Sequence, residues 1–510
     1  VRARTGLSPD APLTGLALSG GGVRSATVSL GFLEELAKRD LLTCFDYLSS
    51  VSGGSYASGY LYSAATEFGD ARHAQLFGPE AKRELLATGK YLAFGSGLQS
   101  VFRLIRLLAA FLSTSFLNLL WMFFLTVAAS SLFVALGRTL SADFDQHAAC
   151  VTYVALGLAV CVPLLRLLAM TLANLVGGST QIVVGKAVNV IEGWNVLVCG
   201  GLFSIFWFAP WLTKHTLYAL ACSFKAPPRS SPWCFNWTAF EHCTWAQSCD
   251  CGPTGTAVPT VFFLALALAS GVVALVLGFL VSSDAIGLYS VFKNLIDSGY
   301  LNAGSRAKAN RPGRSPGAVA AQARVQTRKR LLLHELRSDR NPAFKELPYP
   351  LYNAVAYLQR KIPPPEELRS PEQPHARGRH SPDYFLFSPL HCGAFTTGYA
   401  RLGGGGKLGD GDKVYDQVSL ADAVTCSAAS LTPLMHGDTS RLTAVALLVA
   451  NLNLSSWFAN PNPAFRRTRV AFWPLRYLKM LFGKIYEDCP FIPVADGAFT
   501  DNLGVIELLR

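Results

Sequence analysis

The stretch YLSSVSGGSYASGY, residues 47–60, places Ser52 among glycines and other small residues. We expect residues 45–52 to form a strand that ends at Ser52, and the residues after it to begin a helix. The segment SVSGG matches the nucleophile-elbow pattern Gly-x-Ser-x-Gly, with the first glycine replaced by serine. On its own, this pattern indicates a catalytic serine and a tight structural turn about equally, and TCSAAS around Ser427 frames another serine similarly.

A second glycine-rich turn precedes the first. TGLALS, residues 14–19, has the composition of a short strand, and a helix is expected from about Val23 to Arg39. Alternating strands and helices predict an α/β sheet with helices packed on it. Backbone amides of Gly20, Gly21 and Gly22 would point above the strand ends, as an oxyanion hole requires. The three glycines lack the Gly-x-Gly-x-x-Gly spacing of a dinucleotide-binding loop.

A serine nucleophile needs a base, and the histidines offer no recognisable motif. Near the C-terminus, however, Asp496 ends the apolar segment FIPVA and is followed by glycine in VADGAFTDNLGVIELLR. An aspartate in this position is suited to take the serine proton directly. An ordinary Asp-Gly turn is the alternative interpretation of the same residues.

Together these three motifs resemble those of the patatin-like phospholipase family, over roughly residues 14–70 and 346–510. The resemblance implies a three-layer α/β/α catalytic domain and a Ser52–Asp496 dyad that works without histidine, metal or cofactor. It also implies an oxyanion loop at Gly20, Gly21 and Gly22. For Arg24, contact with a substrate phosphate and pairing with an acidic neighbour stay open.

The composition points to a membrane. Apolar residues make up 51% of the 510 residues and charged residues only 15%, whereas soluble domains carry about 25% charged residues. Four stretches are long enough for a bilayer, which needs roughly 20 apolar residues. They are Leu107–Gly137, Ala148–Leu165, Gly193–Thr213 and Ala257–Val281. The second and third are also compatible with buried helices or a re-entrant hairpin. We therefore expect an inserted bundle of about four transmembrane helices.

Charge and cysteine usage orient these segments. Lysines and arginines lie before the first span and after the last, which places the catalytic domain on the cytoplasmic side by the positive-inside rule. Five of the 12 cysteines lie between residues 222 and 251, in a loop expected outside, where disulfides form. Zinc is less favoured there because Cys249 and Cys251 are spaced too closely. The basic residues 302–330 lack the interleaved aromatics of a nucleic-acid site, so anionic lipid or solvent is their expected neighbour.

These patterns divide the chain into four segments. They are residues 1–100, with the oxyanion loop and nucleophile elbow; residues 101–285, the transmembrane insertion with a cysteine-rich outer loop at 214–256; residues 286–345, a basic linker; and residues 346–510, with the dyad aspartate.

The expected function is that of a membrane-bound serine lipid acyl hydrolase, similar to phospholipase A or lysophospholipase, whose partners are a membrane lipid substrate and the bilayer. Two alternatives stay open. The same dyad would serve a lipid acyltransferase, and a degenerate hydrolase domain would suit a non-catalytic membrane scaffold or transporter. Head-group preference and oligomeric state do not follow from these residues.

Overall fold

The computed structural model describes residues 12–68, 76–88, 98–140, 260–280, 287–309, 330–358, 381–403, 412–432, 447–448, 452–466, 472–481 and 484–509. The chain divides into two compact units. Unit 1 consists of Val1–Thr114, Ser282–Gly437 and Ala450–Arg510, and unit 2 of Ser115–Val281 and Asp438–Val449.

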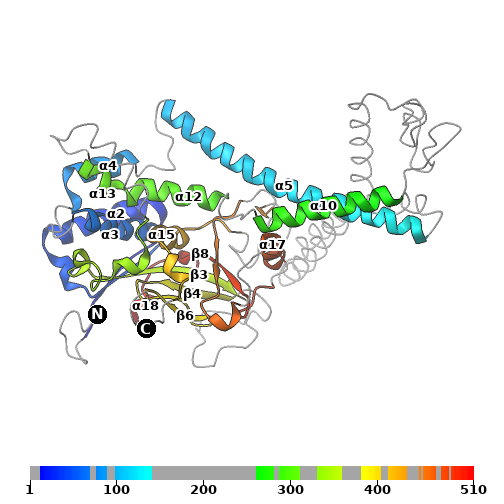
Figure 1. Ribbon diagram of the computed structural model, residues 1–510. Helices are drawn as coiled ribbons and strands as arrows, with labels where there is room; N and C mark the ends of the chain where they lie inside the picture. Colours follow the sequence, from blue (N-terminus) through cyan, green and yellow to red (C-terminus); the bar gives the residue numbers. More distant parts are fainter. Residues whose placement is uncertain are drawn as a thin grey trace, which may run out of the picture. The chain divides into compact units, whose positions relative to one another are not determined.

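Unit 1 is built on an eight-stranded mixed sheet that joins both ends of the chain (Figure 1). Its strands are β1 (Gly15–Leu18), β2 (Tyr47–Val51), β3 (Tyr349–Leu358), β4 (Ser381–Phe387), β5 (His391–Ala394), β6 (Gly398–Arg401), β7 (Ser456–Ala459) and β8 (Phe491–Asp496). β1, β2 and β3 are parallel, and the remaining pairings are antiparallel.

Helices follow the first two strands, as the glycine-rich turns predict. They are α2 (Gly22–Lys38) and α3 (Gly53–Phe68), which pack against each other. α3 is buried along most of its length because its first turns carry only small residues and tyrosines. α15 (Leu420–Ser427) packs against α3, β3 and β8. The predicted α/β class is therefore confirmed.

β3 carries two strands along one edge. β2 pairs with its first half, where Val51 lies opposite Asn353, and β8 pairs with its second half, where Asp496 lies opposite Ala354. β4 occupies the other edge of β3. β2 and β8 run toward each other, so their last residues meet at two consecutive residues of β3.

Part of the segment 286–345 is folded, although its sequence has the composition of a linker. It contains α12 (Leu288–Ile296), a π-helical turn (Asp297–Leu301) and α13 (Ala303–Ala309), all in unit 1. α13 buries small residues, since Ala303 and Ala307 are almost fully inaccessible. Small side chains let helices approach closely without the large apolar residues that signal a core.

The other helical segments are shorter or lie toward the C-terminus. They are α4 (Pro79–Thr88), α17 (Trp473–Leu481), α18 (Ile506–Leu509) and the turns Leu41–Cys44, Leu333–Leu336, Pro342–Phe344, Tyr415–Gln417, Pro463–Phe465 and Gly497–Phe499.

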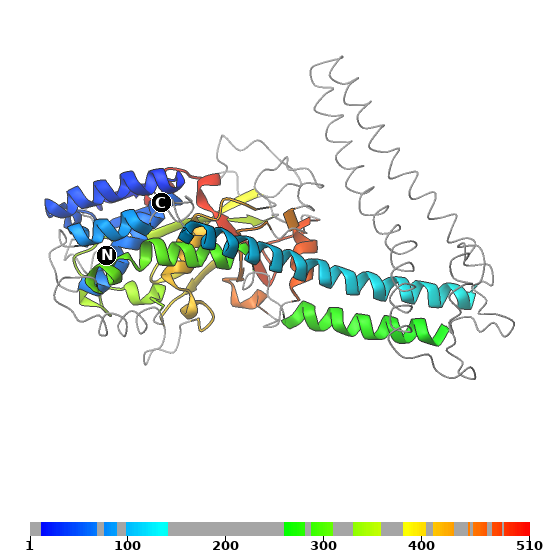
Figure 2. The same cartoon turned by 90° about the horizontal axis from the view of Figure 1, so that it is seen from above.

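Unit 2 contains most of α5 (Leu98–Leu140) and all of α10 (Thr260–Leu280), which run side by side (Figure 2). The indole Nε1–H of Trp121 donates to the Ala274 carbonyl oxygen at 3.0 Å and joins the two helices. The first expected span lies within α5 and the fourth contains α10, whereas the second and third fall outside the described residues. Within the described part of the chain, none of the helices combines the length and hydropathy that a bilayer crossing needs.

Close backbone packing around α3 gives a test of the fold. A Cβ atom at Gly54 would lie 2.4 Å from the Leu18 carbonyl oxygen, so Gly54→Ala should lower the free energy of unfolding by about 1–3 kcal/mol. Gly31, in the exposed part of α2, has nothing within 4 Å of the same position. Gly31→Ala is the matched control and should stabilise by about 0.5–1 kcal/mol. Thermal unfolding of both variants measures the difference, and equal shifts would contradict the packing described.

Candidate active site

The meeting of β2 and β8 along β3 brings Ser52 and Asp496 together. Ser52 directly follows β2, and Asp496 is the last residue of β8. The Ser52 hydroxyl donates a hydrogen bond to Asp496 Oδ2 at 3.0 Å, across 444 residues of sequence. Both side chains are buried, with Ser52 7% and Asp496 3% exposed. The site is therefore a serine–carboxylate pair that water reaches poorly.

Ser52 has the backbone conformation of a sharp turn. Its φ of 49° lies in the left-handed region, which is uncommon for residues other than glycine. α3 begins at the next residue, so the serine stands at the N-terminal end of a helix, where partial positive charge favours an anion. A strained residue between strand and helix is the geometry of a nucleophile elbow.

Burial shifts the acid–base behaviour of Asp496. Removal from water raises the pKa of its carboxyl to about 6. Hydrogen bonds from the Ala498 amide and the Ser52 hydroxyl lower the pKa, but by less than burial raises it. The Ala498 amide donates to Oδ1 at 2.9 Å, so each carboxylate oxygen has one donor. A carboxylate with a pKa near 6 is ionised at neutral pH and is a better proton acceptor than an ordinary aspartate.

The glycine loop lies against the elbow. A Cβ atom at Gly20 would be 3.2 Å from Ser52 Cβ, and one at Gly53 would be only 2.0 Å from the Gly22 carbonyl oxygen. Gly21 and Gly22 have φ values of 135° and 61°, which glycine adopts readily. These contacts require glycine on both sides of the junction between loop and elbow.

One of the three predicted oxyanion donors is engaged elsewhere. The Gly20 amide donates to the Asn502 carbonyl oxygen at 2.7 Å, so it is not free for an oxyanion in this structure. Among the described residues, no partner is recorded for the amides of Gly21 and Gly22. Gly22 is the first residue of α2, where amides have no acceptor within the helix. Gly20 borders the serine and anchors the loop here, and the oxyanion role of the three glycines stays a prediction.

The anchor for Gly20 belongs to a C-terminal loop that the sequence motifs did not single out. Asp501 organises this loop through its carboxylate, which accepts the amides of Leu503, Gly504 and Ile506. The Gly504 carbonyl in turn accepts the hydroxyl of Ser49, on β2. The signal in the sequence was the turn-forming run Asp-Asn-Leu-Gly.

Arg24 lies on α2, two residues after the glycine loop. Its side chain is exposed and makes no ion pair with a described residue. The pairing with an acidic neighbour is therefore absent from the described part of the chain, and contact with a substrate phosphate stays a prediction.

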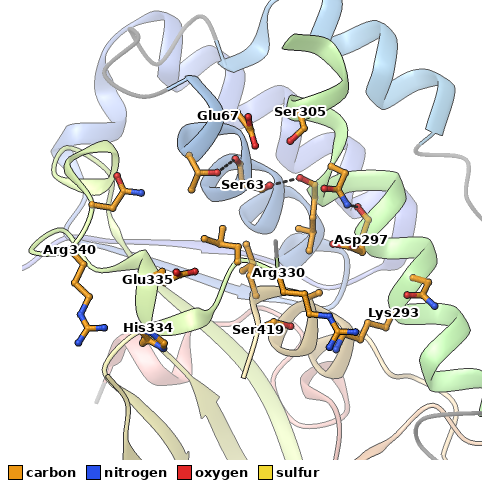
Figure 3. A pocket seen from close by; sticks show the side chains of 18 residues that line it. Ser63, Glu67, Lys293, Asp297, Ser305, Arg330, His334, Glu335, Arg340 and Ser419 are labelled. Carbon is orange, nitrogen blue, oxygen red and sulfur yellow. Dashed lines mark hydrogen bonds between the residues drawn. The ribbon is translucent and has the colours of Figure 1, made fainter. Parts of the chain in front are cut away.

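A separate polar cavity of about 620 Å³ lies in the same unit (Figure 3). Its walls come from the later turns of α3, from α12 and its π-helical turn, and from the first turn of α15, with Lys293, Asp297 and Arg330 among its charged residues. Neither Ser52 nor Asp496 lines it. Lys293 forms an ion pair with Asp422 of α15. The cavity is thus separate from the serine–aspartate pair. No three side chains of the metal-binding kind come together in the described residues.

The architecture and the site define a class: an α/β protein that holds a buried serine on a strand-to-helix turn beside a carboxylate. Residues 16–163 match the family model of patatin-like phospholipase, which supports the resemblance expected from the sequence motifs. The matched segment contains the glycine loop and Ser52. Neither the curated proteins nor the solved structures contain a match. Members of this family are generally hydrolases of lipid esters, so the matched domain implies a lipid substrate.

The raised pKa of Asp496 predicts a pH-dependent stability. Its pKa is about 6 when folded against an ordinary value of 3.8, so between these values the folded chain binds more protons. The free energy of unfolding therefore falls as the pH rises through this window. Asp496→Asn removes this titrating group. The free energy of unfolding of the variant, relative to that of the wild type, should therefore rise by up to about 3 kcal/mol between about pH 4 and pH 7. Denaturant unfolding at both pH values measures this, and a pH-independent difference would contradict it.

Proposed function

We propose that this protein is a membrane-bound lipid acyl hydrolase in which Ser52 is the nucleophile and Asp496 the general base. The observation that carries the proposal is the 3.0 Å hydrogen bond between their buried side chains. The family match supports the substrate class, because phospholipases cleave acyl esters of lipids. The raised pKa of Asp496 supports its role, since a base works best when its pKa is close to the working pH.

The reaction follows from this geometry in two halves. Asp496 Oδ2 takes the Ser52 proton while Ser52 Oγ bonds to the acyl carbonyl carbon, and the carbonyl oxygen becomes an oxyanion. The amides of Gly21 and Gly22 are the donors of the glycine loop that are free to receive it. Collapse of this intermediate breaks the ester bond, and Asp496 gives its proton to the departing alcohol. Water then attacks the acyl-enzyme with Asp496 again as base, which releases a fatty acid and restores Ser52.

Loss of either member of the pair tests the proposal. Ser52→Ala and Asp496→Asn should each abolish release of fatty acid from phospholipid vesicles, on the scale of a million-fold for the nucleophile. Wild-type turnover should also fall about tenfold per pH unit below about pH 6, because protonated Asp496 accepts no proton.

A matched control uses Ser58, a buried serine within α3. Ser58 is fully buried, and its hydroxyl contacts Tyr352 rather than the pair. Ser58→Ala should keep turnover within about threefold of wild type, well inside the range of a residue outside the reaction. Near-normal hydrolysis by Ser52→Ala or Asp496→Asn would reject the assignment.

We propose further that residues 101–285 hold the protein in a bilayer, with the catalytic unit on the cytoplasmic side. The uncharged stretches of the sequence support this, as do the large apolar side chains that α5 and α10 expose. On α5, Phe116 is 61% exposed, and on α10, Leu268 is 72% exposed. Apolar surface of this extent is typical of a lipid or protein contact.

Membrane attachment and sidedness can be measured together. The protein should stay with membranes after an alkaline carbonate wash, because apolar segments in a bilayer are not released by loss of charge contacts. Cys44 is exposed, whereas the other described cysteines, Cys392, Cys426 and Cys489, are buried. A membrane-impermeant maleimide should therefore label Cys44 only in permeabilised cells, and Cys44→Ser should lose that label. Release by carbonate, or labelling of Cys44 in intact cells, would contradict the proposal.

A further inference from the structure

The turn that ends α15 contacts the backbone of both members of the proposed pair. The Ser52 amide donates to the Ser427 carbonyl oxygen at 3.1 Å and to Ser427 Oγ at 3.0 Å. The Asp496 amide donates to the Ala429 carbonyl oxygen at 3.3 Å. Two residues of one short turn therefore accept the amides of Ser52 and Asp496, which come from opposite ends of the chain.

The hydroxyl of Ser427 is fully committed to this arrangement. A serine hydroxyl has one donor and two acceptor positions. Its proton goes to the Asn353 carbonyl oxygen at 2.6 Å, and its lone pairs face the Ser52 amide and the Ser55 hydroxyl, the latter at 2.8 Å. Ser427 is completely buried, so no water competes for these bonds. With its proton given to a backbone carbonyl, Ser427 is unsuited to be a nucleophile, although small residues frame it in the sequence.

The Asn353 carbonyl marks the point where β2 and β8 meet. Asn353 is the residue opposite the end of β2, and its neighbour Ala354 is opposite Asp496. The Asn353 side-chain amide also donates to Ser49 Oγ and to the Ser50 carbonyl oxygen on β2. The Ser427 hydroxyl therefore links the elbow to the strand that sets the separation of Ser52 and Asp496.

The conformation of Ser52 needs such a support. A residue other than glycine in the left-handed region is held at a cost of roughly 1–3 kcal/mol, and it persists only where its surroundings determine it. A buried amide without an acceptor is also unfavourable. Ser427 supplies two acceptors to this one amide, and its hydroxyl proton is directed at the Asn353 carbonyl oxygen.

We propose that Ser427 is a positioning residue for the reaction: its hydroxyl holds the Ser52 amide, and thereby keeps Ser52 Oγ aligned with Asp496. This inference rests on the proposed function of the Ser52–Asp496 pair. Ser427 touches no reacting atom and acts only through the backbone of Ser52.

The test compares two serine-to-alanine variants of the same hydrogen-bond network in the full chain. Ser427→Ala removes the hydroxyl acceptor of the Ser52 amide and leaves only the carbonyl acceptor, so it should lower kcat about tenfold to a hundredfold with KM unchanged, the scale expected for a misplaced reacting group. The rate at which a fluorophosphonate labels Ser52 should fall by a similar factor. Ser55→Ala is the control, because it removes an equally buried hydroxyl that does not contact the Ser52 amide. It should change kcat by less than about threefold, although its effect on Tm should be similar.

The outcomes separate this inference from the proposed function. Full kcat in Ser427→Ala, or equal losses in Ser427→Ala and Ser55→Ala, would overturn the positioning role while an inactive Ser52→Ala still supports the pair. An active Ser52→Ala would instead overturn the proposed function itself. Should Ser427→Ala fail to fold, Ser427→Cys keeps nearly the same shape with a weaker acceptor. It should show the same loss of kcat, and wild-type kcat in this variant would overturn the role.

Discussion

The site depends on the pairing of β2 and β8 with the same edge of β3. A strand has two edges, and β4 fills the other edge of β3, so both strands share the remaining one. One strand is parallel to β3 and the other antiparallel, which makes their carboxyl ends converge. The 3.0 Å contact between Ser52 and Asp496 follows from the register, because Asn353 and Ala354 are adjacent residues of one strand. Shifting either strand by two residues would move its end by about 7 Å and separate the pair.

The burial that suits Asp496 to its proposed role as a base also destabilises the folded chain. The carboxylate loses its hydration, which raises its pKa to about 6, and two hydrogen bonds recover only part of that loss. The strained backbone of Ser52 adds a second unfavourable term. Neutral polar groups support both: the Ala498 amide donates to the Asp496 carboxylate, and the turn at Ser427 accepts the Ser52 amide. No cation pairs with Asp496 among the described residues, so the carboxylate keeps its affinity for a proton.

The sequence predicted the components of the site better than their connections. Ser52, the glycine loop and Asp496 were recognisable because each needs residue types that are rare together: a serine among small residues, consecutive glycines, and Asp-Gly after an apolar strand. The engagement of Gly20 was not predictable, since its acceptor, Asn502, lies 482 residues away and its position depends on the loop around Asp501. Similarly, the burial of α13 was not predictable. Its contacts are made by alanine and glycine, and it lacks the large apolar residues that signal burial in a sequence.

The long segment between β2 and β3 is constrained by its two ends. Tyr47–Val51 pairs in parallel with residues 349–353, so the connecting segment must bring the chain back to the end of the sheet at which β2 begins. The entropy of closing a loop grows only with the logarithm of its length, so an insertion of this size costs little more than a short crossover. The pairing of β2 with β3 also restricts the path of the connecting segment more strictly than the contact between Ser52 and Asp496 does. Any crossings of a bilayer between residues 52 and 348 must be even in number, because a hydrogen-bonded strand pair cannot be divided by a membrane.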